Sequence, residues 1–135
     1  TLTRWTPYKN DISSTVSKVP ILLASVDAVV HERYPDWEVV WYGHIGDGNL
    51  HLNILKPEDL DIAEFKAQCN TVSTDIFEAI KTLGGSVSAE HGVGTLKAPY
   101  LAYTKSESEI AAMRAIKAIF DPDGVLNPGK VFATP

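Results

Sequence analysis

Two histidines, His44 and His51, stand on either side of a glycine-rich turn, where they could bind one metal ion. The runs before and after the turn are rich in β-forming residues, and Asp47-Gly48 is a preferred pair for a two-residue hairpin turn. Such a turn pairs His44 directly with His51 and puts both side chains on one face, with Cβ atoms about 4.5–5.5 Å apart. The sequence therefore predicts a metal-ligand pair. The alternative is a solvated polar face, because short motifs also occur by chance.

A second segment, Ser86-Val-Ser-Ala-Glu-His-Gly-Val-Gly94, supplies a carboxylate and another histidine. Two histidines and one carboxylate form a common three-ligand metal shell that leaves a position for water or substrate. Neighbouring residues of an extended segment point in opposite directions. We therefore expect one of Glu90 and His91 to bind the metal and the other to be free for acid–base chemistry. Taken singly, each could also be an ordinary surface residue.

Composition limits the classes of protein that this chain can represent. Its 135 residues, 44% of them hydrophobic, are enough for one core, so residues 1–135 are predicted to form a single domain. A net charge of −5 without a basic run argues against a nucleic-acid partner. No apolar run approaches 18 residues, so no membrane span is expected. The single cysteine, Cys69, favours a reducing compartment, and we expect a cytoplasmic protein. The chain does not begin with methionine, which suggests a piece of a longer protein.

The order of the predicted elements indicates an α+β fold of the ferredoxin-like type, βαββαβ, with both helices on one face of an antiparallel sheet. Strands are predicted over residues 8–16, 37–45, 49–55 and 86–89, and helices over 17–34 and 59–83. The second helix carries an apolar stripe at a spacing of three and four residues. Ser17 is the expected cap of the first helix. A capping box over residues 106–109 opens a last helix that runs to Phe120, and a turn over 121–124 leads into an extended tail.

Alternation along the two central strands divides the predicted sheet into two faces. The side chains expected to meet the helices are Val39, Trp41, Ile45, Leu50, Leu52 and Ile54. Those expected on the opposite face are Val40, Tyr42, His44, His51, Asn53 and Leu55. This mixture of apolar and polar side chains predicts a partly apolar cleft that is completed by something outside this chain. A modest exposed patch is the alternative.

Three motifs, in this order, resemble the C-terminal domain of the FAD-linked oxidases related to D-lactate, D-2-hydroxyglutarate and glycolate dehydrogenases. They are Gly-His-Ile-Gly-Asp-Gly-Asn-Leu-His, Ala-Glu-His-Gly-Val-Gly and Asp-Pro-Asp-Gly-Val-Leu-Asn-Pro-Gly-Lys, within a resemblance that covers residues 9–132. The resemblance implies a substrate and cap domain of a D-2-hydroxy acid dehydrogenase, which oxidises the 2-hydroxyl group and transfers hydride to flavin. It also implies that the FAD-binding domain, which holds most of the FAD, is N-terminal and absent from this sequence.

The resemblance also assigns roles to individual residues. In metal-dependent members of the family, the residues matching His44, His51 and Glu90 bind a divalent metal, typically zinc. The residue matching His91 is the general base.

The resemblance also implies which residues contact the substrate and the flavin. Lys9 matches a lysine that pairs with the substrate carboxylate, Asn53 a residue near metal and substrate, and Asn127 an asparagine close to the flavin. The segment after Lys9 departs from the family pattern, because Ser14-Thr15 stand where Val-Pro is usual. Arg4 is the candidate for a further substrate-binding cation.

Two other classes of function stay open on the residues alone. A stand-alone metal-dependent hydrolase would use the same two histidines and carboxylate with a metal-bound water. A non-catalytic ferredoxin-like module that binds a ligand would need no metal. The open sheet face also predicts that an isolated chain could pair with a second copy as a homodimer.

Overall fold

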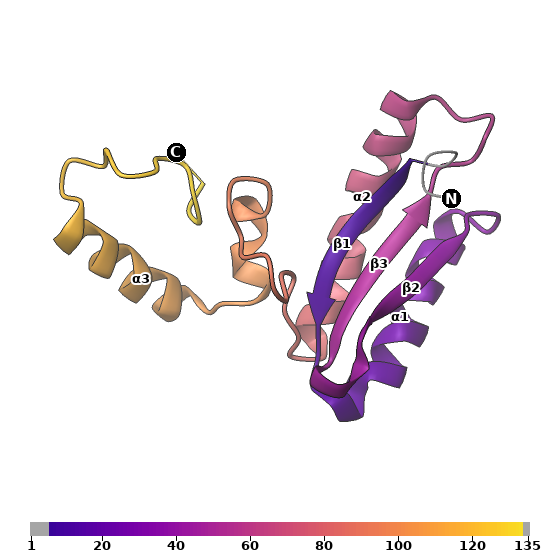
Figure 1. Ribbon diagram of the computed structural model, residues 1–135, viewed down its shortest axis with the longest axis horizontal. Helices are drawn as coiled ribbons and strands as arrows, with labels where there is room; N and C mark the ends of the chain where they lie inside the picture. The colour runs from indigo at the N-terminus through magenta and orange to yellow at the C-terminus, as the bar shows by residue number, and fades with distance from the viewer. Residues whose placement is uncertain (1–5, 134–135) are drawn as a thin grey trace.

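A computed structural model describes residues 6–133, and a three-stranded antiparallel sheet with the strand order β1-β3-β2 lies at its centre (Figure 1). Strand β1 spans Pro7–Ser13, β2 spans Val39–His44 and β3 spans Asn49–Leu55. Helices α1 (Val19–Arg33) and α2 (Ile62–Thr82) lie side by side behind the sheet in Figure 1. The predicted α+β class is thus confirmed, with both long helices on one face of the sheet.

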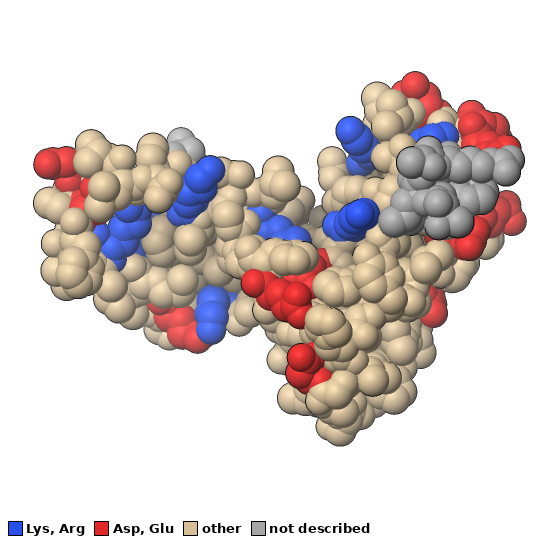
Figure 2. All heavy atoms as spheres, in the orientation of Figure 1, with Lys and Arg blue, Asp and Glu red and all other residues tan. Residues whose placement is uncertain are grey.

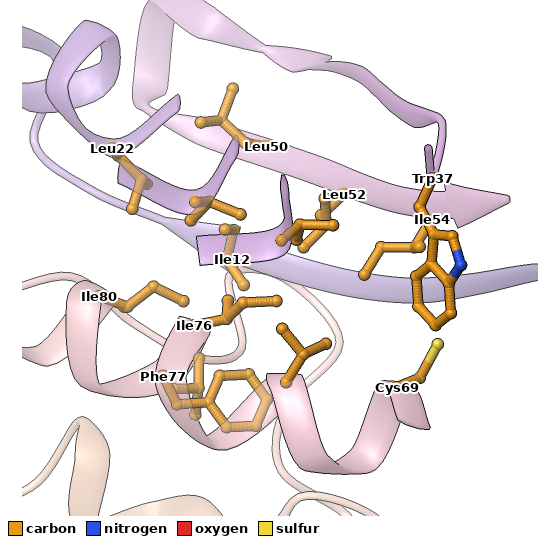
Figure 3. Packing of buried hydrophobic residues seen from close by; sticks show 14 of the residues in the cluster. Ile12, Leu22, Trp37, Leu50, Leu52, Ile54, Cys69, Ile76, Phe77 and Ile80 are labelled. Atoms are coloured by element: carbon orange, nitrogen blue, oxygen red, sulfur yellow. The ribbon is translucent and has the colours of Figure 1, made fainter. Parts of the chain in front are cut away.

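The hydrophobic core fills the space between the sheet and these two helices (Figure 3). Along β3 every second side chain is buried there, and the predicted stripe of α2 meets them. The buried members of that stripe are Phe65, Cys69, Val72, Ile76, Phe77 and Ile80. Burial raises the pKa of the Cys69 thiol to about 12, so this residue packs as a small apolar side chain, as expected.

Helix α1 begins differently from the prediction. Residues Val16–Lys18 form a 3-10 turn, and Lys18 precedes the helix without a side-chain cap. Ser17 lies inside that turn, so the prediction that it caps the helix was wrong, and β1 ends at Ser13 rather than at residue 16. The ammonium group of Lys18 instead donates a 2.7 Å hydrogen bond to the carbonyl oxygen of Leu83, which covers the end of α2.

The hairpin between β2 and β3 has a longer loop than the predicted two-residue turn. Its residues 45–48 include a 3-10 turn over Ile45–Asp47, and Gly48 follows with a left-handed φ of 76°. His44 consequently pairs with Asn49, and His51 pairs with Tyr42. The predicted direct pairing of His44 with His51 was therefore wrong.

The error in register is two residues, which equals the side-chain period of a strand. Both histidine side chains therefore still project from the same face of the sheet, and their ring centroids lie 6.1 Å apart. Asn53 shares that face and pairs with Val40. Ile45, expected to meet the helices, lies in the loop and is 64% exposed.

The fourth predicted strand, over residues 86–89, is reduced to one bridge. Ser13 and Ser86 exchange two backbone hydrogen bonds of 2.9 Å. Beyond this bridge, the Ser86 hydroxyl donates to the carbonyl oxygen of Ser88 and accepts from its N–H group. A local side-chain bond of this kind offers the backbone an alternative to the strand ladder. The sheet described here has three strands, and the full ferredoxin-like topology is not present in it.

The C-terminal part of the chain extends away from the sheet (Figure 1). It contains the short helix η3 (Ala98–Tyr103) and helix α3 (Glu107–Phe120). The predicted capping box is confirmed, because Ser106 and Glu109 each accept a hydrogen bond from the other's backbone N–H group. Within residues 6–133, no helix has the length and apolar character that crossing a bilayer requires.

Candidate functional site

A cavity of about 700 Å³ lies where the open face of the sheet meets the loop over residues 88–97. Strands β1 and β3 supply one wall, because alternate side chains of both strands point away from the helices. The loop supplies the other wall. The polar and charged side chains in its lining are those of Lys9, Asn10, Asp11, Tyr42, His51, Asn53, Ser88, His91, Thr95, Lys97 and Lys130.

Two of the predicted metal ligands, His44 and Glu90, are already in contact. Nδ1 of His44 lies 2.9 Å from Oε1 of Glu90 in hydrogen-bond geometry. The side-chain amide of Asn49, the cross-strand partner of His44, donates to the same carboxylate oxygen. The turn over residues 45–48 and the loop that carries Glu90 are thus joined at this carboxylate.

The third predicted ligand, His51, faces a different carboxylate. Its Nδ1 lies 3.2 Å from Oδ1 of Asp11, the residue opposite it on β1. The ring of Tyr42 packs on the other side, with ring centroids 5.0 Å apart. Among the described residues, no group of three or more His, Cys, Asp or Glu side chains is already arranged to hold a metal ion.

His91, the predicted base, points into the cavity beside His51. The two rings are nearly parallel, with centroids 6.3 Å apart and an interplanar angle of 19°. Nδ1 of His91 lies 3.4 Å from Oδ2 of Asp11, and the ring is 70% exposed. Glu90 and His91 therefore face different partners.

Asp11 is the residue that sequence reasoning missed. Its buried carboxylate accepts hydrogen bonds from the backbone N–H groups of Glu90, at 2.8 Å, and His91, at 3.3 Å. Burial alone would raise the pKa of this carboxyl group. The two backbone hydrogen bonds and the neighbouring His91 and His51 outweigh burial and hold the pKa of Asp11 below its usual value. The only signal in the sequence was its position two residues after Lys9, on the same face of a strand.

Lys97 was missed as well. Its ammonium group donates hydrogen bonds to the backbone carbonyl oxygens of Asp11, at 3.1 Å, and Val87. Burial lowers the pKa of Lys97, and the nearby Asp11 carboxylate opposes this effect. Two attachments thus hold the loop against β1, one through the Lys97 ammonium group and one through the Asp11 carboxylate.

The residues predicted to contact substrate and flavin separate into two places. Lys9 and Asn53 are cross-strand partners, and both line the cavity. Asn127 lies in the tail after α3 and lines a second cavity of about 740 Å³. Lys130 lines both cavities. Arg4 lies outside the described residues.

The donor atoms around the histidine pair fit a divalent cation. Four buried side-chain oxygens have no hydrogen-bond partner within residues 6–133, namely Oγ of Ser14 and Oδ1 of Asp11, Asn49 and Asn53. The last three belong to residues that contact the predicted ligands or line the cavity. An unpaired buried acceptor costs about 1–3 kcal/mol, so such atoms call for a ligand. Imidazole nitrogens and carboxylate oxygens are also the usual ligands of zinc.

The charged side chains that line the cavity are mainly positive, whereas the chain as a whole has a negative net charge. The chain carries a net charge of −5, whereas the cavity is lined by three lysines and one aspartate. Figure 2 shows basic side chains on both sides of the notch between the sheet and the α3 half of the molecule. A cleft with this balance attracts anions.

Comparison with known proteins gives one consistent answer. The family model described as FAD linked oxidases, C-terminal domain, matches residues 2–131. The D-2-hydroxyglutarate dehydrogenases of Stutzerimonas stutzeri and Xanthomonas citri pv. viticola are 59% and 52% identical to this chain over 98% of its length. Glycolate oxidase subunit GlcD of Bacillus subtilis is 43% identical over 73% of it. The chain spans 29%, 28% and 20% of these three relatives, respectively. It belongs to the FAD-linked oxidases and corresponds to their C-terminal domain.

Proposed function

We propose that this chain is the substrate- and metal-binding cap domain of an FAD-dependent D-2-hydroxy acid dehydrogenase, with D-2-hydroxyglutarate as the favoured substrate. The observation that carries the proposal is the grouping of four side chains. His44 contacts Glu90, and the rings of His44 and His91 each lie close to that of His51. Of the four, His51 and His91 line a cavity with a basic lining. The substrate comes from the two bacterial relatives, which are named for this activity.

The cavity contains positively charged side chains that could bind the carboxylate group of a 2-hydroxy acid. Lys9 stands on β1 beside the buried amide of Asn53 and reaches the cavity as a point charge. Lys130 enters the same cavity from the tail. A substrate carboxylate held by these lysines would present its neighbouring C2 hydroxyl group to the histidines.

His91 is the group that would remove the hydroxyl proton. Its ring is exposed to the cavity, and its position is fixed by the backbone hydrogen bond to Asp11. A neutral imidazole within reach of a hydroxyl group is a suitable general base. The flavin supplies the hydride acceptor when the FAD-binding domain, outside this chain, is present.

His44, His51 and Glu90 would hold a divalent metal, with zinc the favoured ion. When bound, such an ion lowers the pKa of a hydroxyl group that it contacts. The unpaired oxygens of Asn49 and Asn53 support this assignment, because the side-chain amide of Asn49 contacts Glu90 and Asn53 lines the cavity. We also propose a cytoplasmic location and the pairing of two copies through the open sheet face. We further propose that residues 86–89 complete a fourth strand in the full-length enzyme.

The test compares variants of the full-length polypeptide that carries this domain. His44→Ala and Glu90→Ala should lose bound metal and should slow flavin reduction by D-2-hydroxyglutarate at least 100-fold. The matched control is His31→Ala, because His31 lies on α1 and its ring binds the carbonyl oxygen of Asp27, away from the cavity. This control should keep both metal and activity.

The full-length polypeptide also distinguishes the proposed dehydrogenase from the two alternative functions. Bleaching of the flavin by a 2-hydroxy acid without oxygen is expected of a dehydrogenase and not of a metal hydrolase or a ligand-binding module. Full activity in His44→Ala after complete loss of metal would contradict the metal assignment. Absence of flavin reduction by any D-2-hydroxy acid would contradict the proposed activity.

A further inference from the structure

We propose that Asp11 fixes the position of the ring proton on both His51 and His91, so that each imidazole carries it on Nδ1 and leaves Nε2 free. Asp11 is thus a positioning residue, which acts through the two histidines. The consequence for metal binding and catalysis rests on the proposed function. The position of the protons does not, because it is a property of the metal-free protein.

The two oxygens of the Asp11 carboxylate have different partners. Oδ1 lies 3.2 Å from Nδ1 of His51, its cross-strand partner, and has no hydrogen bond within the described chain. Oδ2 accepts the N–H groups of Glu90 and His91 and lies 3.4 Å from Nδ1 of His91. Asp11 is only 7% exposed, so little water can take the place of these contacts.

A carboxylate oxygen can only accept hydrogen bonds, which decides where the imidazole proton lies. Nδ1 of His51 and Oδ1 of Asp11 lie 3.2 Å apart without the alignment of a hydrogen bond, so their interaction is electrostatic. An unprotonated Nδ1 would place its negative partial charge beside the carboxylate oxygen, and the two atoms would repel each other. A proton on Nδ1 turns this contact into an attraction. The same electrostatic argument applies to His91 and Oδ2, which are 3.4 Å apart, although the His91 ring is more exposed to solvent. A neutral imidazole carries one ring proton, so Nε2 of each ring is left with its lone pair.

The freed Nε2 atoms are the ones that the proposed chemistry needs. A metal ion binds an imidazole nitrogen through its lone pair, and a general base accepts a proton through the same orbital. Carboxylate–histidine contacts of this kind commonly fix the tautomer of metal-binding histidines. Here one buried carboxylate serves a proposed ligand and the proposed base together.

The substitution Asp11→Asn separates this role from the structural role of Asp11. The two backbone N–H groups of Glu90 and His91 both point at Oδ2, so the amide oxygen of asparagine is expected to take that place. The amide NH₂ group then takes the place of Oδ1 and donates toward Nδ1 of His51. The His51 proton should move to Nε2, whereas His91 still faces an oxygen and should keep its proton on Nδ1.

The experiment measures side-chain ¹⁵N signals of the histidines in the metal-free full-length polypeptide, at a mildly alkaline pH where free imidazole is neutral. Signals are assigned by their loss in His51→Gln and His91→Gln. In the wild type, His51 and His91 should both show the proton on Nδ1. In Asp11→Asn, only His51 should change, and zinc affinity should fall about 10–100-fold.

Asp121→Asn is the matched control. Asp121 is also 7% exposed and also accepts two backbone N–H groups, those of Val125 and Leu126, but it lies at the end of α3. It should leave the histidine signals and the zinc affinity unchanged.

A wild-type His51 or His91 with the proton on Nε2 would overturn the inference, and so would a His51 tautomer that survives in Asp11→Asn. If that variant does not fold, the wild-type signals alone decide. Tautomers as expected in a protein that binds no metal would support this inference while removing the metal from the proposed function.

Discussion

The ammonium group of Lys97 donates a 3.1 Å hydrogen bond to the backbone carbonyl oxygen of Asp11, which lies 86 residues earlier in the chain. The same group also donates to the carbonyl oxygen of Val87. This lysine therefore fixes the start of the loop over residues 88–97 to the strand whose carboxylate holds Glu90 and His91 by their N–H groups. The site depends on both attachments.

Removing this attachment should loosen the loop. Lys97→Met keeps the length of the side chain and leaves the two carbonyl oxygens without their donor, which should lower the free energy of unfolding by about 1–3 kcal/mol. Amide hydrogen exchange over residues 87–97 should become faster. Urea unfolding and exchange measured by mass spectrometry check both expectations.

The control for this substitution is Lys66→Met, because Lys66 is an exposed lysine of α2. Its effect should stay within about 0.5 kcal/mol. Equal effects of the two substitutions would show that the Lys97 hydrogen bonds contribute nothing measurable.

Two glycines of the β2–β3 loop should differ in their tolerance of alanine. A Cβ atom on Gly48 would lie 1.9 Å from the carbonyl oxygen of Ser14, at a left-handed φ of 76°. Gly46 has open space around its Cβ position. Gly48→Ala should therefore lower the free energy of unfolding by more than about 1–2 kcal/mol, the cost of the left-handed backbone alone, and Gly46→Ala should change it little.

Urea unfolding of both alanine variants checks this difference. Because the loop carries His44 at its start, Gly48→Ala should also weaken zinc binding in the full-length enzyme. A Gly48→Ala variant as stable as Gly46→Ala would mean that this loop does not pack against Ser14 in solution.

The end of α3 should open in acid. The hydrogen bond from Lys117 holds the pKa of Asp121 below its usual value, against the opposing effect of burial, and the N–H groups of Leu126 and Val125 help to lower it. Because the pKa is lower in the folded than in the unfolded chain, the carboxylate stabilises the fold above pH about 4. This contribution is lost as the pH falls through the folded-state pKa.

The measurement is the difference in melting temperature between the wild type and Asp121→Asn as a function of pH. The difference should be largest near neutral pH and should shrink below pH about 4. A difference that stays constant down to pH about 2 would show that the charge of Asp121 does not stabilise the tail.

Much of the fold follows from local sequence, because its causes lie within a few residues. The apolar stripe of α2 follows from residues spaced three and four apart, and Ser106 and Glu109 cap α3 through a hydrogen-bond pair that spans three residues. Alternation along β2 and β3 was sufficient to put His44 and His51 on one face. A two-residue error in register left that face unchanged, because the side-chain period of a strand is two.

The motifs also identified His44, His51, Glu90 and His91 as one group from the sequence. What the sequence determined at the site is therefore its residue types and the sheet face that carries the histidine pair.

The tertiary structure decided how those residues meet. In the hairpin loop, Gly48 packs against Ser14, more than 30 residues away in the chain, and the turn motif alone does not reveal that contact. The partner of His51 is Asp11 rather than Glu90, because β1 lies beside β3 and Lys97 holds the loop on β1. These contacts join residues that are 34 to 86 positions apart, so local propensity and periodicity carry no information about them, and only the packing of the strands and the loop decides them.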